Sequence, residues 1–338
     1  MTTSETIASL DQICIFTRSY IGDLELAPYL YRSIKRHVPD ISDVVLVVEE
    51  QDADAFRSII PAWVRLITER KFAPGTIQQK YSKLVADTHT SKEFIWHIDT
   101  DSIFVKRPDI KDLFLGNKPY AEVIRFDDLL AYQDSPAHTA ELKAYVLDTG
   151  LLKNELRKEL VKMGIEDIDG WLEQNYKAWL EDNFEPWFAN WFSSWKNSWG
   201  LDVWRQGTEY AIGDKVDFEF NVTSEKLYPR NVYSICREVL ERNHGVGLED
   251  FIKSRIGVQA LNTPREQYFS DHNFIGAVLH KYMHSSMEWV HVTSKRDEDR
   301  YAARPRSIQQ FNSYDMVENG RLKASAREML EAAMKASG

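Results

Sequence analysis

The chain has 338 residues, 43% of them apolar, which is enough to form the core of one large or two modest domains. Its 52 acidic and 42 basic residues give a net charge of -10, and no segment interleaves Lys and Arg with aromatic residues, so we expect no nucleic-acid partner. Only Cys14 and Cys236 occur, which argues against a disulfide framework or a thiolate metal site and fits a reducing, cytoplasmic setting.

The beginning of the chain and its apolar runs bear on membrane attachment. Residues 1–12 are polar and lack the basic start and the apolar stretch of a signal peptide. No window approaches the roughly 18 apolar residues that a membrane-spanning helix needs. We therefore expect a cytoplasmic protein that is soluble or attached peripherally to a membrane.

Short apolar runs alternate with helical patterns over the first hundred residues. The runs predict buried strands at 13–17, 43–48, 64–68 and 94–98. Apolar residues at helical spacing predict helices at 26–37, 54–60 and 78–89. This alternation predicts an α/β fold with a largely parallel sheet that is covered by helices on both faces.

Beyond residue 100 the pattern changes twice. A short helix at 108–114 and a strand at 121–124 precede a helical, acidic and tryptophan-rich stretch from 127 to about 213, which we interpret as an insertion. The later part predicts strands at 217–220 and 288–292 and helices at 230–243, 270–284 and 322–335. The expected parts of the chain are therefore 1–126, 127–213 and 214–338.

Polar residues follow three of the expected strands, at 17–23, 49–52 and 99–101. In open α/β sheets, ligands bind beyond the carboxyl ends of the strands, where the strand order reverses. We therefore expect these three loops to face one crevice.

The third of these loops contains two carboxylates, Asp99 and Asp101, separated by Thr100. Side chains alternate along an extended chain, so both carboxylates can point toward one hard cation such as Mg²⁺ or Mn²⁺. Such a cation can bridge a diphosphate and stabilise the charge that develops on it as a leaving group. An acidic surface turn gives the same tripeptide, and only its position after a buried strand favours the metal site.

The chain resembles the GT-A superfamily of glycosyltransferases and, more loosely, bacterial GT-A proteins of capsule and lipopolysaccharide sugar transfer. The resemblance rests on residues 15–20, 23–26, 33–35, 79–84, 96–104 and 269–273. It implies a GT-A (Rossmann-like) fold in which 1–126 bind the nucleotide sugar and 214–338 form the acceptor side and the C-terminal helix. The tryptophan-rich segment, 127–213, has no counterpart in the resemblance.

The resemblance also implies an activity and a metal site. The activity is transfer of a sugar from a nucleoside diphosphate sugar, a UDP-sugar by default, to a hydroxyl group of a glycan or glycolipid. Asp101 is implied to be a direct metal ligand, Asp99 a ligand or ribose partner, and His291 a third ligand. A histidine within a strand is also commonly a packed core residue, so both roles remain open for His291.

Four further residues are candidates for donor contacts. Thr17 and Arg18 follow the first strand, and the arginine can bind phosphate through two hydrogen bonds. Tyr20 can stack on the base. The resemblance implies a donor contact for Lys83, although a solvated lysine on a helix and an ordinary surface arginine are the simpler alternatives.

Inverting transfer requires a base that takes the proton of the acceptor hydroxyl, and Asp271 is the candidate. Aspartate in the first turn of a helix is also favoured by the helix dipole without any catalytic role. If Asp271 is not the base, a retaining mechanism becomes more attractive.

The insertion carries a tryptophan stripe, because Trp187, Trp191, Trp195 and Trp199 recur every four residues, and Trp171 and Trp179 precede them at a spacing of eight. Three uses are open: packing against the main domain, recognition of acceptor sugars, or contact with a membrane interface or a second subunit. Pro186 is expected to start the helix.

Two other functions share parts of this pattern. A sugar nucleotidyltransferase has a similar sheet, but usually opens with a glycine-rich loop containing Arg and Lys, which 17–22 do not match. A catalytically silent glycan-binding or scaffold protein can keep the same fold. The sequence has no Gly-x-Gly-x-x-Gly and no Walker loop, which argues against dinucleotide binding and P-loop phosphotransfer.

Overall fold

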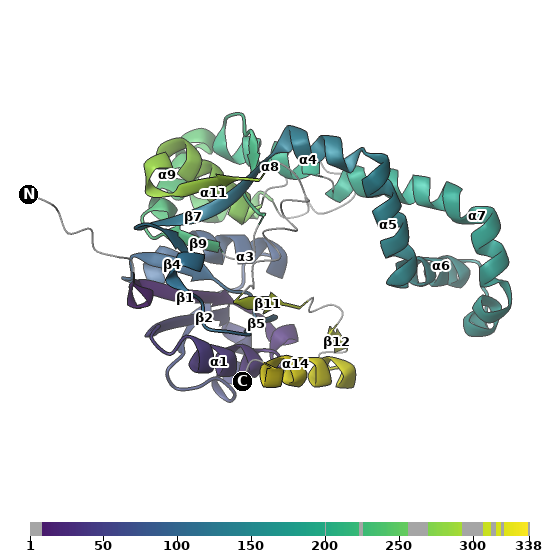
Figure 1. The fold of residues 1–338 in the computed structure, drawn as a ribbon, viewed down its shortest axis with the longest axis horizontal. Coiled ribbons are helices and arrows are strands. Elements are labelled where there is room, and N and C mark those ends of the chain that lie inside the picture. Colours follow the sequence, from purple (N-terminus) through teal and green to yellow (C-terminus); the bar gives the residue numbers. More distant parts are fainter. Residues whose placement is uncertain are drawn as a thin grey trace, which may run out of the picture.

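A computed structural model describes residues 9–199, 201–222, 226–255, 270–292, 307–311, 316–318 and 321–336. Its centre is a five-stranded sheet of order β3-β2-β1-β4-β9 (Figure 1). The strands are β1 (Ile13–Arg18), β2 (Asp43–Glu49), β3 (Arg65–Glu69), β4 (Phe94–His97) and β9 (Lys226–Pro229). The first four are parallel, and β9 runs antiparallel to β4. The chain is therefore a mixed α/β protein with a largely parallel, Rossmann-like sheet, as the sequence predicts.

Alternate side chains of these strands enter two separate cores, one on each face of the sheet. Ile13 and Ile15 of β1 lie in one core, and Cys14 and Phe16 lie in the other. Both faces are covered around β1, β2 and β4, which are buried along nearly their whole length, whereas the edge strand β3 is partly exposed. The helices α1 (Ala27–His37) and α2 (Ala53–Arg57) cover the first face. The second face is covered by α3 (Gly75–Leu84), α9 (Val232–His244), α10 (Leu248–Lys253) and α11 (Asp271–Tyr282).

A second, smaller sheet is built around β7 (Lys118–Arg125). It pairs in parallel with β10 (Glu288–His291) and antiparallel with β6 (Phe114–Leu115) and β8 (Phe218–Glu219). The remaining strands form two short antiparallel pairs: β5 (Ser102–Phe104) with β11 (Ile308–Gln310), and β12 (Val317–Glu318) with β13 (Arg321–Leu322). The C-terminal helix α14 (Ala324–Ala336) packs through Ala326 and Leu330 against Leu26 and Tyr29 near the start of α1.

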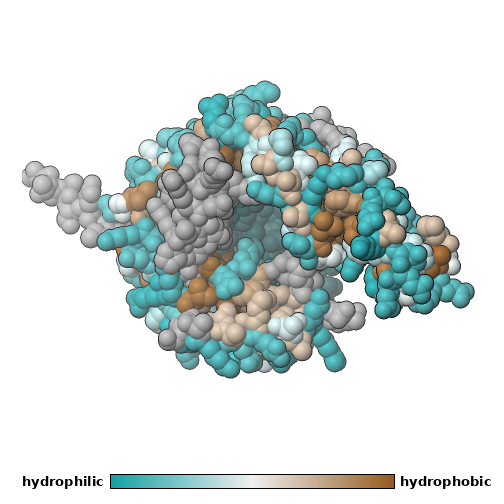
Figure 2. All heavy atoms as spheres, turned by 45° about the vertical axis from the view of Figure 1, so that its right-hand side comes forward, coloured by the Kyte–Doolittle hydropathy of each residue, from teal (hydrophilic) through white to brown (hydrophobic). Residues whose placement is uncertain are grey.

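Five helices separate β7 from β8 in the chain. They are α4 (Phe126–Gln133), α5 (Pro136–Asp148), α6 (Leu151–Lys162), α7 (Ile168–Trp199) and α8 (Leu201–Ile212). Figure 1 shows α4 and α8 beside the main body, with α5, α6 and much of α7 projecting from it; we call this projection the arm. Figure 2 shows apolar side chains gathered on the arm and a hollow in the face beside it. None of the helices in the described ranges has both the length and the apolar character needed to cross a bilayer.

Four tryptophans of the stripe, Trp171, Trp179, Trp187 and Trp191, pack within the arm, and the side chains of Trp195 and Trp199 lie outside the described residues. Trp187 and Trp191 stack with their ring centroids 5.9 Å apart, and both pack against the core that Val146 of α5 and Leu152 of α6 form. The described tryptophans of α7 therefore pack within the insertion. The structure does not show them packing against the main domain. Trp171 and Trp179 pack in a second cluster of the arm around Leu156 and Leu160.

The expectation that Pro186 starts a helix is wrong, because α7 runs through it without interruption. Proline lacks the N–H that would bond four residues back and costs about 3 kcal/mol in a helix interior. Phe188, which is 3% exposed, packs on both Phe184 and Trp191, and this aromatic packing around the proline offsets the lost hydrogen bond.

Candidate functional site

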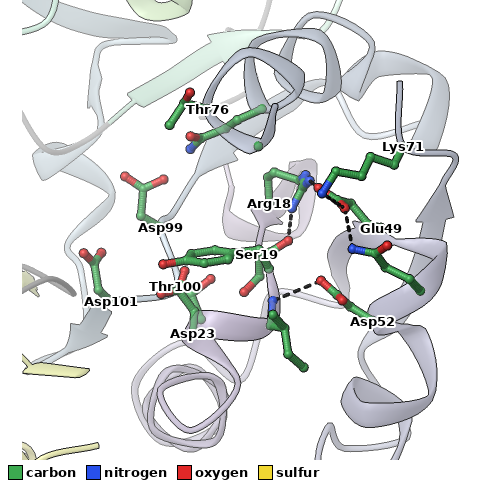
Figure 3. A pocket seen from close by; sticks show the side chains of 15 residues that line it. Arg18, Ser19, Asp23, Glu49, Asp52, Lys71, Thr76, Asp99, Thr100 and Asp101 are labelled. Atoms are coloured by element: carbon green, nitrogen blue, oxygen red, sulfur yellow. Dashed lines mark hydrogen bonds and ion pairs between the residues drawn. The ribbon is translucent and has the colours of Figure 1, made fainter. Parts of the chain in front are cut away.

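A cavity of about 480 Å³ opens at the carboxyl ends of β1, β2 and β4 and reaches the start of α3. It is lined by Arg18, Ser19, Tyr20, Ile21, Asp23, Glu49, Gln51, Asp52, Lys71, Gly75, Thr76, Gln79, Asp99, Thr100 and Asp101. Residues of all three polar loops line it. Figure 3 shows Arg18, Glu49 and Lys71 grouped at one end of the cavity, and Asp99 and Asp101 at the other.

The acidic end is a tight turn between β4 and β5. The amide of Ser102 donates to the carbonyl of Asp99 at 3.1 Å, which closes the turn. The amide of Phe311 donates to the carbonyl of Asp101 at 2.8 Å, so the segment after β11 holds the turn from outside. This backbone support leaves the carboxylates of Asp99 and Asp101 on the cavity wall.

A third carboxylate, Asp23, lies at the same end of the cavity. Its side chain is largely buried, and its Oδ1 atom has no hydrogen-bond partner within the described residues. Burial, with the nearby carboxylates of Asp101 and Asp99, raises the pKa of Asp23 to about 7. The acidic end therefore concentrates negative charge. Sequence reasoning named the loop that contains Asp23 but did not single out this residue.

The opposite end of the cavity is a preformed charge cluster around Glu49. Its Oε1 atom lies 3.3 Å from Arg18 Nη2, and its Oε2 atom lies 3.0 Å from Lys71 Nζ. Arg18 also donates to the carbonyl of Ser19. The backbone amide of Ile21 donates to Asp52 at 3.0 Å, so the two loops after β1 and β2 are joined. Glu49, Asp52 and Lys71 were not predicted individually, although the first two follow a strand end, a position that sequence can reveal.

The expected donor contacts after β1 divide between two environments. Thr17 lies within β1, is fully buried and is outside the cavity lining. Tyr20 lines the cavity and is 44% exposed. A Cβ atom at Gly22 would lie 2.4 Å from Cε2 of Tyr20, so a glycine there lets the ring lie across the loop.

Two hydroxyl groups of the cavity, Ser19 Oγ and Thr100 Oγ1, are buried and lack a hydrogen-bond partner in the described part of the protein. Buried polar atoms are rarely left unpaired in native proteins. Both oxygen atoms lie beneath the surface of the cavity wall. Together with Oδ1 of Asp23, they are buried polar atoms beside the cavity that have no partner in the described residues.

Lys83 is buried on α3 and does not line the cavity, so the expected donor contact is not what the structure shows. Its Nζ atom lies 3.5 Å from Asp99 Oδ1, 3.4 Å from Asp271 Oδ2 and 3.1 Å from Nε2 of His272. Burial alone would lower the pKa of Lys83, but Asp271 and Asp99 outweigh it and raise that pKa. Lys83 therefore joins α3, the acidic turn and the start of α11.

Asp271 begins α11 and is 8% exposed. Burial would raise its pKa, but Lys83, followed by His272, outweighs that effect and holds the pKa of Asp271 well below its usual range. A general base works best with a pKa near the working pH. This carboxylate is a weak proton acceptor and is outside the cavity lining, so the geometry does not support the expected role of Asp271 as the catalytic base.

His291 does not join the acidic pair. It ends β10, which pairs with β7 of the second sheet, and its ring contacts Phe218 with the centroids 5.1 Å apart. Across the described ranges, no three His, Cys, Asp or Glu side chains form a group that could hold a metal ion. The expected triad of Asp99, Asp101 and His291 is therefore not assembled, because the strand carrying His291 belongs to a different sheet from β4.

Among known proteins, similarity was found only at the level of solved structures. No family model matches the sequence. No curated protein matches it either. Among solved structures, the apo structure of the bifunctional glycosyltransferase WbbM is similar to part of the chain, with a TM-score of 0.25 and 12% identity over 40% of this chain. The matched region spans 26% of that protein.

Proposed function

We propose that this chain is a GT-A glycosyltransferase. It moves a sugar from a nucleoside diphosphate sugar, a UDP-sugar by default, to a hydroxyl group of a glycan or glycolipid. The observation that carries the proposal is the cavity itself, in which the acidic turn of Asp99 and Asp101 faces a preformed cluster of Arg18, Glu49 and Lys71. Cavities of roughly 300–1,000 Å³ with a few fixed polar groups are typical small-molecule sites.

The acidic end fits a divalent cation, Mn²⁺ or Mg²⁺. Magnesium typically takes one or two protein carboxylates and completes its shell with water and substrate phosphates, so Asp99 and Asp101 suffice without a third protein ligand. Burial, followed by the nearby carboxylates of Asp101 and Asp99, raises the pKa of Asp23, and the grouping of these three carboxylates supports a cation at this end. When bound, such a cation supplies positive charge to the diphosphate leaving group.

The protein's own groups then bind and orient the donor. Tyr20, which is exposed at the cavity wall, offers a face for the base. Arg18 and Lys71 are fixed by Glu49 before the ligand arrives, which lowers the entropy cost of binding. Lys83 holds Asp99 from behind and has a positioning role.

Binding of UDP tests the donor site directly. We expect isothermal titration calorimetry to show UDP binding that requires Mn²⁺ and is lost with a chelator. Asp101→Asn should weaken this binding at least about 10-fold, the loss that follows even when only a supporting residue of a metal site is removed. Asp214→Asn is the matched control, because Asp214 is exposed, pairs with Lys281 and lies outside the cavity lining.

Release of UDP from a panel of UDP-sugars with Mn²⁺ tests the activity. We expect release by the wild-type protein and a marked loss in Asp101→Asn. Mn²⁺-dependent binding of UDP without release from any donor, even with an acceptor library, would favour the catalytically silent protein. UDP binding that is equal with Mn²⁺ and with a chelator would contradict the metal-dependent donor site.

A further inference from the structure

A second cavity, of about 260 Å³, lies where the insertion meets the main body. Leu129 of α4 and Trp204 of α8 line it, together with Ile124 and Val222. Glu219 of β8, Asn221 after that strand, and Ser270 and Asn273 at the beginning of α11 complete the lining. The lining therefore combines apolar and aromatic side chains with carboxylate, amide and hydroxyl side chains.

The polar side chains of this cavity are held in place by hydrogen bonds to one another and to the backbone. Oε2 of Glu219 accepts from the Asn273 side chain at 2.9 Å, and Oε1 accepts from the Asn221 amide at 3.0 Å. The Asn273 carbonyl oxygen accepts from the amide of Phe220 at 2.8 Å, which sets the orientation of that side chain. A carboxylate has about four acceptor positions, so Glu219 keeps acceptor capacity toward the cavity. Burial raises the pKa of Glu219.

These lining residues offer the two kinds of contact that bind a pyranose ring, an aromatic surface and hydrogen-bonding groups. A sugar ring presents C–H groups on its faces, which pack on an aromatic plane such as Trp204, and hydroxyl groups on its rim. Glu219 can accept hydrogen bonds from those hydroxyl groups, and the amides can both donate and accept. A small, preoriented set of polar groups beside an apolar wall is the usual design of a specific small-molecule site.

Helix α3 contacts residues that belong to both cavities or directly follow them in the chain. Ser270 in its wall directly precedes Asp271, whose carboxylate lies 3.4 Å from Lys83 Nζ. Lys80, one helical turn before Lys83 on α3, places its ammonium group 5.7 Å from the centre of the Trp204 ring. The lysines of α3 therefore contact residues of both cavities, Lys83 at Asp99 and Lys80 at Trp204.

We propose that this second cavity binds a pyranose unit of the acceptor, with Trp204 as its stacking face and Glu219 as its hydrogen-bond acceptor. The proposal rests on the glycosyltransferase function above and assigns the acceptor side of the same site. It gives the insertion a role in choosing the acceptor, because Leu129 and Trp204 both come from it. The stripe tryptophans Trp187 and Trp191 pack inside the arm instead.

Fluorine NMR of protein labelled with 5-fluorotryptophan tests the proposal without knowledge of the natural acceptor. The Trp204 signal is assigned by its loss in Trp204→Phe. The probes are the methyl pyranosides of glucose, galactose, mannose and N-acetylglucosamine. We expect at least one of them to shift the Trp204 signal saturably, and Trp204→Ala to weaken the binding of that glycoside about 10-fold by saturation-transfer NMR.

Glu219→Gln, which keeps the shape of the side chain, should also weaken binding of the glycoside. Trp171→Phe is the matched control, because Trp171 packs within the arm and should leave glycoside binding unchanged. The proposal is overturned if no glycoside shifts the Trp204 signal, or if Trp204→Ala binds the glycoside as the wild type does. Mn²⁺-dependent UDP binding is measured on the same samples: its absence in the wild type defeats the donor site, whereas its retention in Trp204→Ala shows an intact fold.

Discussion

The ammonium group of Lys83 lies 3.5 Å from Oδ1 of Asp99 in the acidic turn. The same ammonium group is 3.4 Å from Asp271, on a helix that the chain reaches much later. Lys83 and Asp271 are both buried, so their ion pair stabilises the fold only while both partners are present, whereas the side chain of Asp99 stays 41% exposed. The acidic turn, α3 and α11 are therefore joined through one side chain.

The coupling between Lys83 and Asp271 can be measured by a double-mutant cycle. Lys83→Met alone should lower the free energy of unfolding by about 3–5 kcal/mol, since it leaves a buried carboxylate without its partner. Adding Asp271→Asn to that variant should recover part of the loss, which gives a coupling energy of roughly 0.5–3 kcal/mol from urea denaturation.

The exposed pair of Asp214 and Lys281 supplies the control cycle. Because water and salt screen exposed charges, its coupling should be indistinguishable from zero at high salt. Equal coupling in the two cycles would show that burial of Lys83 does not strengthen its ion pair with Asp271.

The lowered pKa of Asp271 makes its contribution to stability depend on pH. The unfolded chain takes up this proton at a higher pH than the folded protein, so the stabilisation is complete above the unfolded pKa of about 3.9 and is lost as the pH falls below it. The wild type should therefore exceed Asp271→Asn in free energy of unfolding near pH 7, and the gap should shrink in strong acid.

Urea denaturation of the wild type and Asp271→Asn at several pH values measures this gap. If the gap instead grew as the pH fell, Asp271 would have a raised pKa in the folded protein. A raised pKa would restore the case for Asp271 as a proton acceptor, which the ion pair with Lys83 argues against.

The position of Tyr20 is tested by Gly22→Ala. The new methyl group would lie 2.4 Å from Cε2 of Tyr20, so the ring has to move. Stacking of a base on an aromatic side chain contributes about 1–3 kcal/mol, and Gly22→Ala should lose part of this in the affinity for UDP with Mn²⁺. Tyr20→Ala gives the full loss for comparison, and calorimetry measures both variants.

Gly247→Ala is the matched control, because a Cβ atom there has no described neighbour within 4 Å. It should leave UDP affinity unchanged. If Tyr20→Ala weakened UDP and Gly22→Ala did not, the ring would keep its place despite the methyl group. If neither variant weakened UDP, Tyr20 would not be part of the base site.

The local pattern of apolar residues was sufficient to predict most strands of the central sheet. The strands β1, β2 and β4 were predicted because buried parallel strands require apolar residues on both faces, and Val44 to Val48 satisfy that requirement without interruption. The edge strand β3, which is partly exposed, was also predicted. The strand β9 was missed, since four residues ending in Pro229 give little signal, and proline is accepted there because β9 lies at the edge of the sheet.

The charged residues of the site were predicted from their position at strand ends, not from hydrophobic pattern. Asp99, Asp101 and Arg18 were found because polar residues at the ends of parallel strands meet at one edge of a sheet. Asp23 and Lys71 lie farther along their loops, and only the structure shows that they reach the same cavity. Lys83 was named from the sequence, but its partners could not be read from spacing.

The sequence by itself therefore determined the α/β class, the parallel strands and the crevice at their carboxyl ends, because these follow from hydrophobic periodicity and from chain direction. Tertiary structure alone decided that Lys83 meets Asp271, that His291 belongs to another sheet, and that Trp204 and Glu219 line the same second cavity. The physical reason is that these contacts join segments far apart in the chain, and packing of complete helices and sheets, not local spacing, sets which side chains meet.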